Sequence, residues 1–165
     1  MKKSLVILSL ATVLCLAWCW WSWNVVEYND WFVDLVKACT DSTQTLFNDF
    51  EKEDSSVDSI MESLDNSIKI CKDSESKASK MGSYDWDSSL RDAVAELLST
   101  EVQYLQIFAW TSRYWNLENI TDEDKVAYDS VVNELYQMEE VLNHQFTTLQ
   151  QVQEWFAAKH WLKLE

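Results

Sequence analysis

The sequence predicts an all-α protein: an antiparallel up-down four-helix bundle with a long C-terminal helix, preceded by a lipoprotein signal peptide. Three observations lead to this prediction. Apolar residues recur every three or four positions in four segments, and no segment alternates as a strand does. The length of 165 residues suits one domain. An apolar N-terminal run ends at a cysteine. We therefore divide the chain into a signal peptide (1–18), a lipidated cysteine with its tether (19–24) and a helical domain (25–165).

The N-terminus has the organisation of a secretory signal peptide. Lys2 and Lys3 form a positive start, and the apolar stretch 4–17 follows. Leu16-Ala17-Trp18-Cys19 resembles the bacterial lipobox, in which Leu, a small residue and Gly or Ala precede a cysteine. The thiol of that cysteine receives a diacylglycerol, and the cysteine becomes the new N-terminus. We therefore predict lipidation at Cys19, although Trp18 departs from the pattern because the signal peptidase requires a small side chain there.

Glycine and tryptophan occur in unusual numbers. The chain contains 1 Gly, 0 Pro and 10 Trp, whereas ordinary usage predicts about 12 glycines. Replacing each Trp by Gly restores the lipobox and makes a flexible tether of the residues after it. It also places Gly in the turn-like stretches at Trp86 and Trp115 and after a helix end at Trp161. We hypothesise that the source organism reads UGA codons as glycine.

The alternative is a protein that is rich in tryptophan. Residues 4–23 would then form a nearly unbroken apolar run with aromatic residues at its end, which is the length and pattern of a single membrane span. Lys2 and Lys3 would hold the N-terminus inside. Both interpretations predict an extracytoplasmic domain, held to the cell envelope by a lipid anchor or by this span.

The first two helices are predicted to form a hairpin. A charged turn at 51–56 separates their apolar stripes and ends in residues that favour a helix N-cap. The first stripe consists of Val25, Tyr28, Phe32, Leu35, Cys39, Leu46 and Phe50, with Thr43 in its one gap. The second consists of Val57, Met61, Leu64, Ile68 and Cys71, and continues weakly through Ser74 and Ala78.

Two further helices follow the loop at 83–88, where Ser88 or Ser89 can cap the third. The third stripe includes Glu101, and we expect the neighbouring Val102 to take the buried place. The stripe consists of Leu90, Val94, Leu97, Leu98, Glu101, Leu105 and Phe108. A loop is predicted at 109–121. The fourth helix starts at a Thr121 cap, and its stripe is Tyr128, Val131, Leu135, Met138, Leu142, Phe146, Leu149, Val152 and Phe156.

Two cysteines remain once Cys15 leaves with the signal peptide and Cys19 takes lipid. Cys39 and Cys71 lie on the apolar stripes of the hairpin helices, and their midpoint is Ser55 in the turn. Residues equidistant from the turn of an antiparallel hairpin lie at the same level, so the two thiols face each other. We predict a Cys39–Cys71 disulfide worth about 3 kcal/mol or more. The alternative is two buried free cysteines.

Composition and motifs exclude several functions. The net charge of −15 argues against nucleic acid and against anionic membrane surfaces as partners. The sequence contains no nucleophile elbow, phosphate loop, dinucleotide fingerprint or EF-hand loop, so we predict no enzyme, no cofactor and no metal. Glu140 and His144 are spaced as half a metal site, but the Glu-x-x-His signature of di-iron bundles is missing. A surface ion pair is the favoured interpretation of these two residues.

Four segments resemble a group of small helical bacterial surface lipoproteins. They are Tyr28-Asn29-Asp30, Leu90-Arg91-Asp92-Ala93, Ile120-Thr121-Asp122-Glu123 and the C-terminal run from Phe156 to Glu165. The resemblance covers most of 24–165 and implies a helical fold and a location at the cell surface. It implies no substrate, because that group has no characterised activity.

These observations predict a non-catalytic envelope lipoprotein with a binding or structural role. An extracytoplasmic bundle that binds a small ligand or acts as a sensor is the first alternative. It would need a pocket near the core gaps at Thr43, Ser74 or Glu101. A metal-handling bundle is the second alternative, with Glu140 and His144 as its only basis.

Overall fold

The computed structural model describes residues 24–52, 54–115 and 121–162, and within these ranges it is all-α, as predicted. The predictions for the signal peptide, Cys19 and most of the tether lie outside the described residues. Within the described ranges no strand is present. The elements are α2 (Val25–Phe50), α3 (Val57–Lys80), α4 (Ser89–Thr111), the short 3₁₀ helix η1 (Ser112–Tyr114) and α5 (Asp122–Lys159).

The helix starts are fixed by side chains that accept backbone hydrogen bonds. Asn24 caps α2 and Thr121 caps α5, each in a capping box with the residue three positions later. Ser88 occupies the N-cap position of α4, one of the two serines expected there, but its side chain makes no capping hydrogen bond. The backbone N–H and the hydroxyl of Ser89 instead donate to the Asp87 carboxylate, at 3.0 and 2.7 Å. An aspartate three positions before the predicted stripe therefore accepts the hydrogen bonds at the start of this helix.

The α2–α3 hairpin is cross-linked at three levels. The sulfur atoms of Cys39 and Cys71 lie at a disulfide distance of 2.01 Å, in the pairing that the sequence predicted, and both residues are fully buried. One turn nearer the loop, the Ser67 hydroxyl donates to the Ser42 carbonyl at 2.9 Å. Closer still, the Ser63 hydroxyl donates to the Asp49 carboxylate at 3.0 Å. Together these contacts hold α2 and α3 in register along half of their length.

Helix α4 is the most buried helix, and it extends beyond its predicted end. It runs to Thr111, into the stretch that the sequence analysis assigned to a loop. Val102 is buried, as expected, but it does not displace Glu101 from the core, because both residues are only 6% exposed. Helix α4 contacts α3 on one side and α5 on the other, so the positions flanking its main stripe are buried as well.

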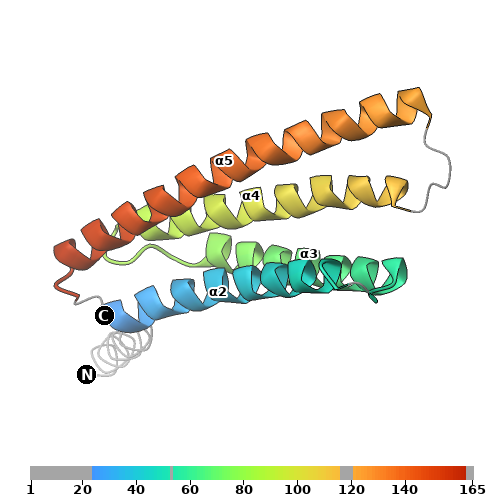
Figure 1. Cartoon of the computed structure of the whole chain (residues 1–165). Helices are drawn as coiled ribbons and strands as arrows, with labels where there is room; N and C mark the ends of the chain where they lie inside the picture. The colour runs from blue at the N-terminus through green and yellow to red at the C-terminus, as the bar shows by residue number, and fades with distance from the viewer. Residues whose placement is uncertain (1–23, 53, 116–120, 163–165) are drawn as a thin grey trace, which may run out of the picture.

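The four helices do not close into a ring along their whole length. Helix α2 packs on α3, α3 on α4 and α4 on α5, but α5 makes few contacts with α2. Helices α2 and α5 meet near the C-terminal end of α5, where the rings of Tyr28 and Phe156 stack at 5.7 Å. From there α5 diverges from α2 toward its own N-terminus (Figure 1). Only Leu142, Phe156 and Ala157 of this 38-residue helix are buried.

None of the helices in the described part of the chain combines the length and the apolarity that a membrane span needs.

Candidate functional site

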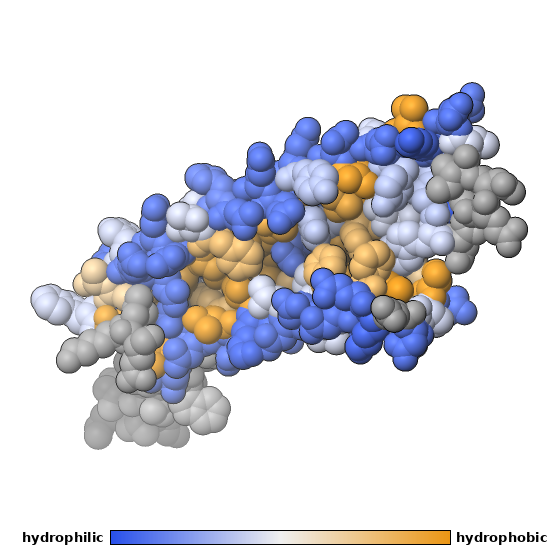
Figure 2. Space-filling view, viewed as in Figure 1, coloured by the Kyte–Doolittle hydropathy of each residue, from blue (hydrophilic) through white to orange (hydrophobic). Residues whose placement is uncertain are grey.

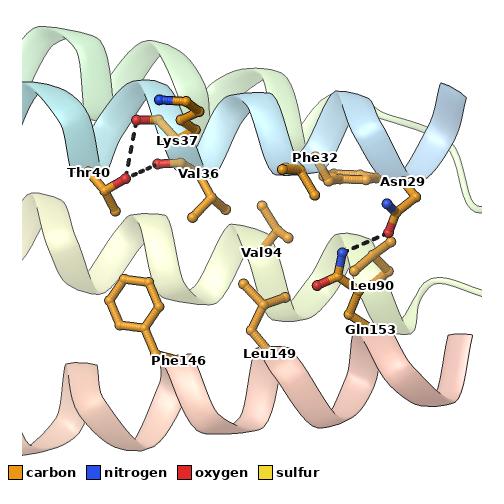
Figure 3. A pocket seen from close by; sticks show the side chains of 11 residues that line it. Asn29, Phe32, Val36, Lys37, Thr40, Leu90, Val94, Phe146, Leu149 and Gln153 are labelled. Atoms are coloured by element: carbon orange, nitrogen blue, oxygen red, sulfur yellow. Dashed lines mark hydrogen bonds between the residues drawn. The ribbon is translucent and has the colours of Figure 1, made fainter. Parts of the chain in front are cut away.

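A groove runs between α2 and α5, with α4 as its floor. Figure 2 shows hydrophobic surface gathered between these helices in the middle of the face, with hydrophilic surface on both sides. The deeper part of the groove is a hollow of about 280 Å³. Helix α4 contributes Leu90 and Val94, and α5 contributes Phe146 and Leu149, whose side chains converge with those of α2 (Figure 3). The α2 wall consists of Asn29, Phe32, Val33, Val36, Lys37 and Thr40.

A hydrogen bond between two amides marks the polar part of the groove. The side-chain amide of Gln153 in α5 donates to the Asn29 carbonyl oxygen in α2 at 3.0 Å (Figure 3). Both residues, together with Val33, also line a second and wider hollow of about 940 Å³. The two hollows are therefore continuous. The second one carries Asp30 on the α2 wall and Glu154 on the α5 wall, and it reaches the C-terminal end of α5.

The groove contains exposed apolar side chains that could contact a ligand. Val33 is 43% exposed and Phe146 is 39% exposed, and both line the deeper hollow. The amide pair supplies directional hydrogen bonding beside them. Apolar walls with a few convergent polar groups are the usual composition of a binding site, although 280 Å³ lies near the lower limit for a drug-sized ligand. No group in the groove lining is arranged as a nucleophile with its base.

This groove was not predicted from the sequence, although a signal for it is present. Beside its main stripe, α2 carries a second row of residues spaced three and four apart. That row is Val26, Asn29, Val33, Val36 and Thr40, and all five residues line one hollow or the other. Two of its members are polar, so it does not read as a core stripe. A row that mixes apolar and polar residues at helical spacing fits the wall of an open groove.

The core gaps where the sequence placed a possible pocket do not line the groove. Thr43, Ser74 and Glu101 are all buried in the core, and none of them lines either hollow. Burial raises the pKa of the Glu101 carboxyl above its usual range. Glu101 is therefore a core acid whose neutral form the fold favours.

A cluster at the C-terminal end of α5 fastens that helix to the α3–α4 loop. The buried Asp87 carboxylate accepts a hydrogen bond from the Lys159 ammonium at 2.9 Å and lies 3.4 Å from His160 Nε2. Burial alone would raise the pKa of Asp87, but hydrogen bonds from Lys159, Ser89 and His160 hold it well below its usual range. The Tyr28 hydroxyl donates to the Gly82 carbonyl nearby, and burial raises the pKa of Tyr28 to about 12.

Replacing Asp87 by Asn is expected to destabilise the fold by about 1 kcal/mol at neutral pH. Asn keeps an acceptor for Ser89 but loses the charged interaction with Lys159. Because the Lys159 side chain is partly exposed, water screens that interaction, and its loss lowers the stability only modestly. Because the folded pKa of Asp87 lies well below its unfolded value near 3.8, the stabilisation is fully present above pH 3.8. It declines below that pH and is lost only as pH falls through the lower folded pKa. Urea unfolding of both forms between pH 7 and 3 should show a constant difference down to about pH 4 and the start of a decrease below it. A difference that does not change with pH would contradict this assignment.

Glu140 and His144 do not form the surface ion pair that we expected. Both side chains are exposed, and no ion pair joins them in the described part of the chain. The same part brings no three His, Cys, Asp or Glu residues together as ligands for a metal ion. His160, the other histidine, instead packs edge to face on Tyr84 at 5.0 Å and belongs to the Asp87 cluster.

No family model, curated protein or solved structure matches the chain.

Proposed function

We propose that the chain is a non-catalytic, lipid-anchored envelope protein that uses the α2–α5 groove to bind a partner. The observation that carries the binding role is this groove, where α2 and α5 leave Val33 and Phe146 exposed above an apolar floor. A domain with a purely structural role would gain stability by closing α5 onto α2. The open side therefore favours a binding function.

The location rests on the N-terminal sequence. Cys19 follows an apolar signal-like segment, and the tether from Cys19 to Asn24 spans at most ~17 Å. The start of α2 and the adjoining end of the groove would therefore lie close to the membrane. The Cys39–Cys71 pair supports an oxidising compartment, because disulfides persist outside the cytoplasm and are rare within it.

Glycine at the tryptophan positions is part of this proposal, because Gly at position 18 would complete the lipobox. Two tryptophans support the hypothesis: Trp86 and Trp161 have φ of 63° and 60°, the left-handed region that favours glycine. Three others, Trp31, Trp110 and Trp155, lie inside helices, where glycine costs about 1 kcal/mol relative to alanine. The codons in the gene decide between the two: UGA at these positions supports glycine and UGG refutes it.

Substituting Cys19 by Ala is expected to abolish lipidation and to release the domain from the membrane fraction. Cells would be labelled with a radioactive fatty acid, and the intact mass of the purified chain would be measured. Wild type should carry the label and begin at Cys19, whereas the variant should carry none. Cys15→Ala is the matched control, because that cysteine leaves with the signal peptide and its loss should change neither result. A wild-type chain that starts at Met1 and carries no label would refute the lipid anchor.

If the protein binds a small ligand, the pocket lies elsewhere than the sequence suggested. Its pocket would be the α2–α5 groove rather than the core gaps at Thr43, Ser74 and Glu101, and the amide pair of Asn29 and Gln153 would orient the ligand. No observation favours the metal-handling alternative.

A further inference from the structure

The α2–α5 groove has the length and shape of a site for one helix. Its α2 wall extends from Val25 to Thr40, which corresponds to ~22 Å along the helix axis. That length matches about four turns of a docked helix. The floor is apolar along the deeper hollow, and the groove is open on the side away from α4 (Figure 2). An amphipathic helix lays its apolar face into a groove of this kind through residues at i, i+3, i+4 and i+7.

The charge of the two walls selects the kind of helix. Helices α2 and α5 together carry thirteen Asp and Glu residues against three Lys residues. The charged residues that line the groove itself are Asp30, Glu154 and Lys37. Two of those lysines are already paired, Lys37 with Asp41 and Lys159 with Asp87. Asp30 and Glu154 face the wide hollow from opposite walls, and neither makes an ion pair with a Lys or Arg within the described ranges. Carboxylates on both walls favour an occupant with Lys or Arg beside its apolar face.

The same charge disfavours two other occupants. A second copy of the chain would bring another net charge of −15 to walls that are already acidic. A fatty acid or other anionic amphiphile would place its headgroup among these carboxylates. Both would lose affinity through repulsion between like charges, whereas a basic amphipathic helix gains affinity and a faster association rate from the same field.

We infer that the α2–α5 groove docks a basic amphipathic helix of a partner protein, with its apolar face on Val33, Phe146 and the α4 floor. Its Lys or Arg residues then lie against Asp30 and Glu154. This inference rests on the proposed function, because it names the partner chemistry for the same groove.

The test uses the mature chain in phosphatidylcholine vesicles and a fluorescent sixteen-residue peptide of Leu and Lys with Leu at helical spacing. Fluorescence anisotropy, corrected for empty vesicles, should show saturable binding that weakens as salt is raised. Val33→Ser and Phe146→Ser should each weaken binding about tenfold. Both side chains are partly exposed, so these variants should keep the helical circular dichroism of wild type. Tyr136→Ser is the matched control: it is an exposed aromatic of α5 outside the groove lining, and its loss should leave binding unchanged.

Two comparison probes determine whether the inference holds. A peptide of the same composition with its Leu residues scrambled out of helical spacing should bind about tenfold more weakly, and equal binding would overturn the inference. Sodium oleate should fail to displace the Leu–Lys peptide. Displacement by oleate, or no binding of the peptide at all, would also overturn it. The intact mass of the same sample reports the lipid on Cys19 separately, so loss of the anchor and loss of helix docking are distinguishable.

Discussion

Removing the link between Cys39 and Cys71 is expected to destabilise the domain by about 3.5 kcal/mol. The two cysteines are 32 residues apart, and cross-linking a loop of that size restricts the unfolded chain by about this amount. The chain between them forms the α2–α3 hairpin, so the unlinked chain must recover its register from Ser67, Ser63 and side-chain packing. For a domain of this size the melting temperature should fall by roughly 10 °C.

Urea unfolding of wild type and of the Cys39→Ala/Cys71→Ala double variant, each with and without reductant, measures this effect. Reductant should lower the unfolding midpoint of wild type toward that of the variant and leave the variant unchanged. Because Cys15 and Cys19 are the same in both chains, they do not affect the comparison. Two outcomes together would show that the cysteines are free. The unfolding midpoint of wild type would not change with reductant, and two thiols of the denatured domain would react with an alkylating reagent.

The hairpin illustrates which features of the fold were predictable from sequence. Cys39 and Cys71 lie on clear apolar stripes at equal distances from a charged turn, so periodicity and arithmetic were enough to pair them. The cap at Thr121 was equally readable, because the threonine and Asp124 have the spacing of a capping box. Both signals are local. The capping box involves residues that are close in sequence, and the cysteine pairing depends only on the position of the single turn that joins α2 and α3.

The features that sequence did not predict depend on how distant helices meet. Glu101 is buried because α4 contacts helices on both sides, and its own stripe cannot show that. Asp87 was overlooked because its partners, Lys159 and His160, lie more than 70 residues away. The groove requires α5 to diverge from α2, and the angle between two helices is set by packing rather than by the period of either. Phe146 belongs to the apolar stripe that was predicted for this helix, yet it remains 39% exposed.

Replacing Trp86 and Trp161 by glycine is expected to stabilise the fold by about 1–2 kcal/mol in the double variant. The two side chains are 96% and 93% exposed, so they gain almost nothing from burial. Their left-handed backbone costs a residue with a Cβ about 1–2 kcal/mol, and glycine avoids that cost. Glycine also loses more conformational entropy on folding, about 0.5–1 kcal/mol per site. The relief of strain exceeds this loss at both positions, because neither side chain contributes packing that would be lost.

Trp155→Gly is the control that separates backbone conformation from the loss of a tryptophan. Trp155 is 53% exposed and lies inside α5, where its ring packs under the Lys159 ammonium. Glycine there should destabilise the domain by about 1 kcal/mol, because a helix interior favours almost any other residue. Thermal unfolding of the single variants Trp86→Gly, Trp161→Gly and Trp155→Gly should therefore show a higher melting temperature for the two turn positions and a lower one for the helical position. If Trp86→Gly and Trp161→Gly also lowered the melting temperature, the left-handed geometry would not determine residue choice at these sites. Glycine at positions 86 and 161 would then lose its structural support, whichever amino acid the gene encodes there.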